Sequence, residues 1–443
     1  METTKKLAEF ITATGFADLP PETIREAKLC FLDWLAVTMA GVHDPVTDSV
    51  FDVIRLVGGK PQATVLGRNT RTSVLNATLL NGMASHALDF DDTSVEFLGH
   101  PSVTLFPCLL ALAEWKRKNG RDFLGAFVIG YEAGCRVALG ATAIHYLAGW
   151  HGTSTIGHFS SAAGAAKLLN LTADQLVHAL GTAGTQAAGL KVVFGTSCKP
   201  FHAGKAGFNG LLSVLLAQRG FTSADNILEA PNGFWNVFAA DRQVDQALVD
   251  WGDTWHILKN NYKFHASCHG THAPIEAVLA LKRDHPLDPV EIRQVDIIVS
   301  APMLEVAGKE KPARGLEGKF SIPYSVANAL LSGDTGIAAF TDERVQDAET
   351  VALRDKVRVI AGDQVDLFEA DVTIHAGGKI YRRKYNMLTQ ELAPEEKREL
   401  IHTKFRSLAG LSLGKKRSEE VIERADNLED EGDMAAVVRL LQP

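Results

Sequence analysis

The stretch between residues 87 and 101 reads Ala87-Leu88-Asp89-Phe90-Asp91-Asp92-Thr93-Ser94-Val95-Glu96-Phe97-Leu98-Gly99-His100-Pro101. This acidic segment gathers carboxylates and an imidazole among apolar residues, directly after a run that predicts a buried helix. Burying carboxylates beside apolar residues is costly unless other groups pair with them. The sequence therefore predicts that the rest of the chain folds so that cations reach the acidic segment.

A helical conformation of the acidic segment would place Asp89 and Thr93 on one face, because residues four apart are neighbours on a helix. His100 then stands where a proline forces the chain to leave the helix. We expect Asp89 to orient a histidine or lysine and to tune its pKa. Asp91 and Asp92 could instead cap a helix and pair with arginines, and we favour this structural role for Asp92.

Composition indicates a soluble globular protein. The chain has 443 residues, of which 46% are hydrophobic and 22% charged, and roughly 150 residues per domain predicts two or three domains. A net charge of -8 without a Lys/Arg cluster argues against nucleic-acid binding. Five scattered cysteines without a CxxC pair favour a reducing, cytoplasmic setting. We find neither a signal peptide nor an apolar run near the roughly 20 residues of a membrane span.

The first part of the chain predicts a bundle of helices. Several of them are rich in Ala, Gly and Ser and apolar on all sides, which is typical of buried helices. Thr172 is a candidate N-cap for one of them. The predicted helices cover residues 20–41, 45–57, 72–88, 101–117, 121–146, 156–169, 172–189 and 204–219.

The pattern changes after about residue 262. Alternating apolar and polar residues predict strands over 290–299, 356–360, 369–375 and 380–385, and helices are predicted over 271–283, 321–332 and 342–354. From Pro394 the chain returns to amphipathic helices that are too few for a core of their own. We therefore expect a multi-domain α and α+β fold. The large all-α helical domain takes residues 1–265 and 398–443, and a smaller α+β domain takes residues 266–397.

Further candidate functional residues lie in four places. His151 stands between two glycines, where a ligand can approach closely, although such a histidine is more often structural. Lys199, His202 and Lys205 lie in what we interpret as a glycine-bounded connection between two buried helices. Tyr324 opens a predicted helix and could simply be a packed aromatic residue. The fourth stretch reads Tyr262-Lys263-Phe264-His265-Ala266-Ser267-Cys268-His269-Gly270-Thr271-His272.

The histidines and cysteine of this fourth stretch do not have zinc-finger spacing, and the chain contains no HExxH, so we predict no metal site. The sequence also lacks GxGxxG, GxxxxGK[ST], GxSxG and EF-hand patterns. Nucleotide, hydrolase-type and calcium chemistry are therefore not indicated.

Taken in order, these stretches resemble one family, MmgE/PrpD. No single motif is decisive, but the ordered set is specific and covers nearly the whole chain. The matching residues are Ala27-Lys28, Leu32-Asp33-Trp34-Leu35-Ala36, Ala40-Gly41, Asp89-Phe90-Asp91-Asp92-Thr93, His100-Pro101, His151, Lys199-Pro200-Phe201-His202-Ala203-Gly204, Lys263, Ser267-Cys268, His272-Ala273, Ile275-Glu276-Ala277, Lys319-Phe320-Ser321 and Tyr324.

The resemblance implies a homodimer with an active site in a cleft between a helical and an α+β domain. Known activities of the family are 2-methylcitrate dehydratase, cis-aconitate decarboxylase and iminodisuccinate epimerase, all without an organic cofactor. Carried over by position, we expect catalytic roles for Asp89, His100, His151, Lys199 and Tyr324. We expect Thr93, His202, Lys263, Ser267 and His272 to bind the substrate.

These activities share the breaking of a bond at a carbon next to a carboxylate, and preorganised cations stabilise the resulting carbanion. The overall sequence resembles the iminodisuccinate epimerase most, so we expect an epimerase acting on an iminodisuccinate-like amino polycarboxylate. The alternative is 2-methylcitrate dehydratase or a related hydro-lyase acting on a tricarboxylate. Two other classes remain open: a metal-dependent prenyl-transferring or terpene-cyclising enzyme, suggested by the aspartate-rich acidic segment, and an inactive helical scaffold.

Overall fold

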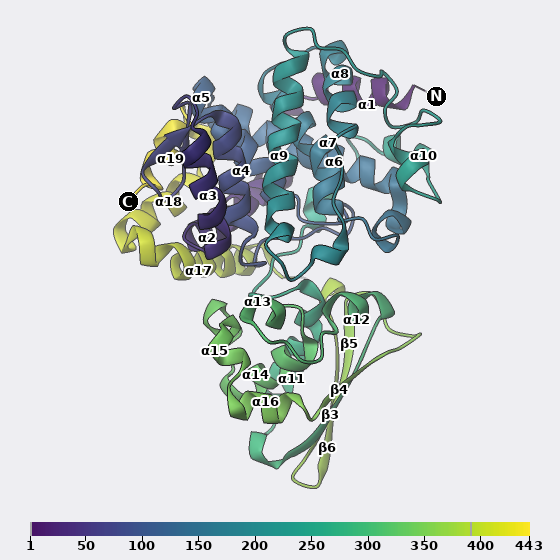
Figure 1. Ribbon diagram of the computed structural model, residues 1–443, viewed down its shortest axis with the longest axis vertical. Coiled ribbons are helices and arrows are strands. Elements are labelled where there is room, and N and C mark those ends of the chain that lie inside the picture. Colours follow the sequence, from purple (N-terminus) through teal and green to yellow (C-terminus); the bar gives the residue numbers. More distant parts are fainter. Residues whose placement is uncertain (1, 390–391) are drawn as a thin grey trace. The chain divides into compact units, whose positions relative to one another are not determined.

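The computed structural model of the protein describes residues 2–389 and 392–443. The chain divides into two compact units (Figure 1). The helical unit comprises the residues up to Ala87, Asp91–Tyr262 and Arg398–Pro443, and the α+β unit comprises Leu88–Phe90 and Lys263–Lys397. The predicted fold class, a large helical domain with a smaller α+β domain, is confirmed.

The helical unit is built around helices whose small residues allow close packing. Helices α4, α5, α6, α7 and α9 pack against one another, and most of their residues are buried. The elements of this unit are α1 (Thr3–Ala13), α2 (Pro21–Gly41), α3 (Pro45–Val57), β1 (Ala63–Val65), β2 (Thr70–Thr72), α4 (Val74–His86), α5 (Ser102–Lys116), α6 (Gly120–Leu147), α7 (Gly152–Leu168), α8 (Ala173–Gly184), α9 (Cys198–Ala217), α10 (Phe234–Phe238), most of α17 (Pro394–Leu413), α18 (Lys415–Asp426) and α19 (Ala435–Leu440).

Helix α6 is an exception to the prediction that no segment could span a membrane. Among the described residues it is the one helix that is long and apolar enough to do so, but 94% of its most apolar window is buried inside the protein. Other helices surround α6, and a buried core helix needs no polar face.

The α+β unit contains a four-stranded sheet in the order β4-β3-β5-β6. β3 runs parallel to β4 and antiparallel to β5, and β5 and β6 form a hairpin. Gly377 and Gly378 connect the hairpin, and both have the positive φ angles that a tight two-residue turn requires. The elements are α11 (His272–Asp284), β3 (Ile292–Val299), α12 (Ala301–Ala307), α13 (Gly315–Gly318), α14 (Ile322–Ser332), α15 (Asp342–Val345), α16 (Ala348–Arg354), β4 (Val357–Ala361), β5 (Glu369–Ala376) and β6 (Lys379–Asn386).

The single helix predicted over residues 342–354 is instead two short helices, α15 and α16. The Asp347 carboxylate accepts a hydrogen bond from the backbone N–H of Thr350 at 3.0 Å. Asp347 therefore caps a new helix in the middle of the predicted one.

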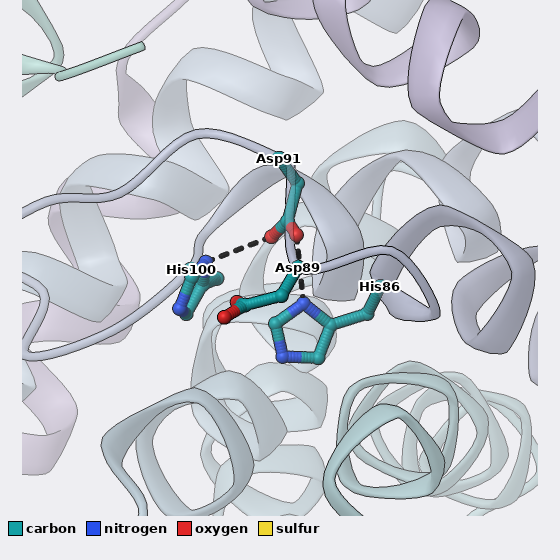
Figure 2. A group of neighbouring side chains, drawn as sticks. All are labelled: His86, Asp89, Asp91 and His100. Carbon is teal, nitrogen blue, oxygen red and sulfur yellow. Dashed lines mark hydrogen bonds and ion pairs between the residues drawn. The ribbon is translucent and has the colours of Figure 1, made fainter. Parts of the chain in front are cut away.

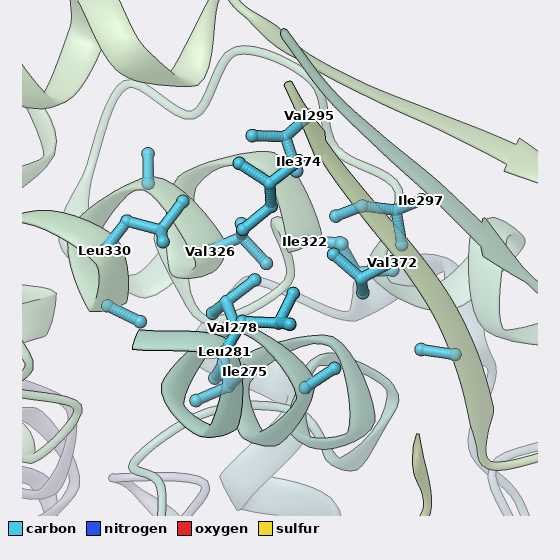
Figure 3. Close-up of a cluster of buried hydrophobic side chains, with 14 of the residues drawn as sticks. Ile275, Val278, Leu281, Val295, Ile297, Ile322, Val326, Leu330, Val372 and Ile374 are labelled. Atoms are coloured by element: carbon cyan, nitrogen blue, oxygen red, sulfur yellow. The ribbon is translucent and has the colours of Figure 1, made fainter. Parts of the chain in front are cut away.

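One face of the sheet packs against α11 and α14 (Figure 3). Ile374 of β5 pairs with Val295 of β3, and Val372 pairs with Ile297, so the alternate residues of both strands share this face. The helices contribute Ile275, Val278 and Leu281 of α11 and Ile322, Val326 and Leu330 of α14. This core gives the α+β unit an apolar interior of its own.

We predict that Ile374→Ala destabilises the α+β unit by about 2–5 kcal/mol, because it removes a fully buried side chain and leaves a cavity. Ile380→Ala in the neighbouring strand is the matched control. Ile380 is 68% exposed, so its truncation should cost less than about 0.5 kcal/mol. Urea unfolding followed by circular dichroism measures both. Equal midpoints for the two variants would contradict this description of the core.

Candidate active site

Two glycines let α4 and α9 approach each other backbone to backbone. A Cβ atom on Gly82 would lie 2.6 Å from the Cα atom of Gly204, so neither position tolerates a larger residue without a shift. The close approach brings together His86, the last residue of α4, and Lys199, in the first turn of α9. The buried Lys199 ammonium lies 3.1 Å from Nε2 of His86 and donates a hydrogen bond to it.

The prediction that Lys199, His202 and Lys205 lie in a connection between two helices is wrong, because α9 already begins at Cys198 and contains all three. Gly204, which suggested the end of this connection, serves helix packing instead. Gly204, Gly207 and Gly210 follow a three-residue spacing, and a Cβ atom on each would clash with a neighbouring helix.

The acidic segment is not helical, contrary to the expectation from its spacing. α4 ends at His86, and Asp89 has a left-handed φ of 50°. The segment then runs as irregular backbone, in which Thr93 exchanges two backbone hydrogen bonds with Asn261, both 2.8 Å long. Asp89 and Thr93 therefore do not share a helical face.

Asp91 is the centre of a buried hydrogen-bond network (Figure 2). One oxygen of its carboxylate lies 2.8 Å from Nδ1 of His86, and the other lies 2.8 Å from Nδ1 of His100. Nδ1 of His100 also lies 2.8 Å from the carbonyl oxygen of Asp92. Because both neighbours of this nitrogen are acceptors, Nδ1 must carry the proton.

These contacts fix the protonation sites of both histidines. His86 donates from Nδ1 to Asp91 and accepts from Lys199 at Nε2, which forms a continuous Lys199–His86–Asp91–His100 chain. His100 is held in the same tautomer, so its Nε2 atom carries the lone pair. Orienting an imidazole through a carboxylate on one nitrogen leaves the other nitrogen available as a base.

A second close approach brings His151 to this network. A Cβ atom on Gly99 would lie 2.5 Å from the backbone nitrogen of Thr153, so the end of the acidic segment lies directly on the start of α7. The ring of His151 lies 6.3 Å from that of His86. Nδ1 of His151 lies 3.0 Å from Nδ1 of His202. Since one nitrogen must donate and the other accept, the two imidazoles have opposite tautomers.

Burial keeps this histidine cluster uncharged. Desolvation, together with the nearby Lys199 charge, holds the pKa of His151 well below its usual value and lowers the pKa of His100 and that of His202 to about 4. Burial also tends to raise the pKa of Asp91, but its contacts with His86 and His100 outweigh this effect and hold that pKa well below its usual value. At neutral pH Asp91 is therefore ionised, whereas His100, His151 and His202 are neutral.

Asp92 does not cap a helix and has no arginine partner among the described residues, so this expectation is wrong. The fully buried carboxylate accepts hydrogen bonds from Ser102 at 2.5 Å and Asn260 at 3.0 Å. Desolvation, with the charge of Asp33 nearby, raises the pKa of Asp92 to about 8. Asp92 is therefore largely protonated at neutral pH and anchors the acidic segment as a neutral group.

The α+β unit holds a second group of the predicted site residues. The buried ammonium of Lys263 lies 2.9 Å from both the carboxylate and the carbonyl oxygen of Asp89. Nε2 of His272 lies 3.2 Å from the carbonyl oxygen of Ser267, and the Ser267 hydroxyl is hydrogen-bonded to Thr271 at 2.7 Å. Burial and the neighbouring His265 and His269 hold the pKa of His272 well below its usual value.

Tyr324 lies near the start of α14 and is buried. Its hydroxyl donates a hydrogen bond to the carbonyl oxygen of Ala339. Desolvation raises the pKa of its phenol to about 12. In this conformation Tyr324 is a neutral donor that the backbone already occupies, so proton transfer to a substrate requires the hydroxyl to turn away from Ala339.

The structure thus groups His100, His151, Lys199 and His202 in the helical unit, and Asp89, Lys263, Ser267 and His272 in the α+β unit. Two further residues, His86 and Asp91, belong with the helical group. Sequence reasoning missed His86 entirely and missed the central position of Asp91. A histidine at the end of a small-residue helix, five positions before an aspartate, was the available signal.

Comparison with models of known protein families shows which family the chain belongs to. The MmgE/PrpD N-terminal domain model matches residues 5–247, and the MmgE/PrpD C-terminal domain model matches residues 265–430. The chain belongs to the MmgE/PrpD family. The resemblance recognised in the sequence is therefore confirmed, and the protein is a member of a family of enzymes.

Relatives in this family match the chain over nearly its full length. A cis-aconitate decarboxylase-like protein, oryM, of Aspergillus oryzae is 26% identical over 466 residues, which cover 99% of this chain and 97% of that protein. The cis-aconitate decarboxylase of Aspergillus terreus is 25% identical, with 99% and 95% coverage. That of Mus musculus is 27% identical, with 99% and 93% coverage.

We predict that Asp91→Asn forces one imidazole of the network into another tautomer. The amide offers an N–H donor where the carboxylate has an acceptor, so it cannot accept from both Nδ1–H groups. Nitrogen-15 NMR of labelled histidines should show Nδ1–H forms of His86 and His100 in the wild type and a change at one of them in the variant. Asp245→Asn, at an exposed position, should leave both unchanged. Unaltered signals in Asp91→Asn would refute the bridging role.

A second prediction concerns pH and Asp92. The folded protein raises the pKa of this carboxyl from 3.8 to about 8, so the folded state retains a proton that the unfolded state loses. This contribution to stability falls as the pH rises from about 4 to about 8. Asp92→Asn mimics the protonated group and should therefore gain stability relative to the wild type between pH 5 and pH 8.5. Urea midpoints at the two pH values measure this, and a difference independent of pH would contradict it.

Proposed function

We propose that this protein is a cofactor-independent lyase acting on a small tricarboxylate of the cis-aconitate class. The sequence alone favoured an iminodisuccinate epimerase, with a lyase as the alternative. The lyase is now better supported, because the relatives that match nearly the whole chain are named cis-aconitate decarboxylases. We further propose that the enzyme acts in the cytoplasm as a homodimer and without a metal.

The observation that carries this proposal is the buried Lys199 beside neutral histidines. Its ammonium contacts His86, which in turn hydrogen-bonds to Asp91. A lysine cation in a desolvated site suits the carboxylates of a polyanion.

Loss of CO2 from such a substrate leaves the electron pair of the broken carbon–carbon bond on the substrate. The pair spreads over the adjoining unsaturated carboxylate system, and the Lys199 ammonium stabilises the growing negative charge. A proton must then be delivered to carbon. His151 is our candidate for the donor, and its contact with His202 provides a path for the proton that replaces it.

The depressed pKa of His151 fits this role. An imidazole that is neutral in the free enzyme gains proton affinity when a polyanion binds beside it, because negative charge raises its pKa. The acid is therefore formed when the substrate arrives. Tricarboxylate binding should be accompanied by proton uptake at pH 7.

The decisive experiment incubates the purified protein in D2O with cis-aconitate, 2-methylcitrate or iminodisuccinate and follows the reaction by proton NMR. We expect loss of CO2 or water from a tricarboxylate, with one deuterium entering carbon in the decarboxylation. Deuterium exchange into iminodisuccinate without loss of CO2 or water would contradict the lyase and identify an epimerase. The same reaction with EDTA tests the expected independence of metal.

We predict that Lys199→Ala and His151→Ala each lower kcat/KM by at least about a hundredfold, or about 2.7 kcal/mol, because they remove the cation and the proton donor. Lys205→Ala is the matched control. It lies on the same helix, but its ammonium lies over the ring of Phe208 rather than near His86. Circular dichroism should show that all three variants fold. Activity in the first two close to that of Lys205→Ala would remove these residues from the mechanism.

A further inference from the structure

The helical unit has a cavity whose lining shares no residue with the histidine cluster. It has a volume of about 620 Å³ and lies between the β1–β2 hairpin, the end of α5 and helix α19. Three arginines line it, Arg71, Arg117 and Arg439, together with Gln442. Each arginine comes from a different part of the chain, so folding has gathered them.

The walls of this cavity are held in place by hydrogen bonds that are distant in sequence. The backbone N–H of Gly67 donates to the carbonyl oxygen of Leu441, and that of Asn69 donates to Oε1 of Gln442, both at 3.0 Å. These bonds tie the end of the chain to the hairpin. The cavity is therefore a built feature rather than a gap between mobile loops.

The arginines differ in how fully they are neutralised. Arg71 pairs with the buried carboxylate of Glu114, which also lines the cavity. Arg117 pairs with Asp433 at 2.5 Å, but its side chain is 71% exposed. Arg439 forms no ion pair or hydrogen bond with the residues that the structure describes. The lining thus carries more positive than negative charge, and Arg439 is available for a ligand.

Gln442 adds an unsatisfied donor to the same lining. Its Oε1 atom accepts from Asn69, while its Nε2 atom is buried without a hydrogen-bond partner in the described part of the chain. A buried amide N–H group without an acceptor destabilises the folded protein. An oxygen-rich ligand in the cavity would supply the acceptor that this group lacks.

The cavity is remote from the histidine cluster. α5 begins at Ser102, which binds Asp92 of the acidic segment, and its last turn carries Glu114 to the cavity. Its 15 residues span about 22 Å at 1.5 Å per residue. The two places therefore lie at opposite ends of one helix.

We infer that this cavity is a second binding site for a small oxyanion that carries several negative charges, either a phosphate compound or a polycarboxylate. Guanidinium groups match the paired oxygens of both, which Arg117 and Arg439 can contact from two helices. The volume accommodates a ligand larger than a single phosphate ion. The site is distinct from the proposed catalytic one and does not depend on it.

The test is isothermal titration calorimetry of the full-length protein with pyrophosphate and, in a separate arm, with citrate. We expect binding of both or of one, which assigns the preferred chemistry, and Arg439→Ala should weaken it at least tenfold. Arg25→Ala removes an equally exposed arginine of the helical unit that does not line the cavity. This control should bind like the wild type.

Lys199→Ala separates the two sites. Binding of either anion that survives Lys199→Ala but is lost in Arg439→Ala supports the inference. Turnover by Arg439→Ala without added anion should equal that of the wild type. The inference is overturned if neither anion binds, if Arg439→Ala binds like Arg25→Ala, or if Lys199→Ala alone abolishes pyrophosphate binding. Arg117 and Arg439 would then serve only as positive charges near helix C-termini.

Discussion

The buried carboxylate of Asp91 is the constraint on which the histidine cluster depends. An ionised carboxylate without solvent is tolerated only when hydrogen bonds replace its hydration. His86 donates a hydrogen bond to one oxygen of Asp91, and Nδ1 of His100 lies 2.8 Å from the other oxygen. The same bonds that stabilise the carboxylate also fix the tautomers of His86 and His100. The contacts that compensate the buried charge of Asp91 are therefore the same contacts that orient the two histidines.

This arrangement needs backbones that approach more closely than ordinary side chains allow. Gly82 and Gly204 bring α4 against α9, and Gly99 lets the acidic segment lie against the start of α7. Without these approaches Lys199 could not reach His86. The many small residues of the central helices thus determine more than packing density, because they set the distances between charged and polar groups that come from distant parts of the sequence.

Most secondary structure could be predicted from periodicity, because burial of one face leaves a direct trace in the sequence. The β5–β6 hairpin, with its Gly377–Gly378 turn, and the Thr172 cap of α8 are examples. The failures have a common cause. Glycines near Lys199 suggested a loop although they serve helix contacts, and the spacing of the acidic segment suggested a helix although Asp89 is left-handed. In both places, contacts between residues distant in sequence determine the backbone conformation. The central position of Asp91 was missed because its partners come together only after folding.

Buried lysines influence the protonation of the histidines near them. Each unit, taken by itself, buries a lysine near histidines, Lys199 with His86 and Lys263 near His272. A buried lysine disfavours protonation of neighbouring imidazoles, so desolvation and lysine charge act together to lower the pKa of His151 and of His272. A polyanionic ligand reverses that balance, since its carboxylates offset the lysine charge and favour imidazolium. Under the proposed function, the resting cluster would gain protons only with its ligand, and acid catalysis would depend on substrate binding without any change of fold.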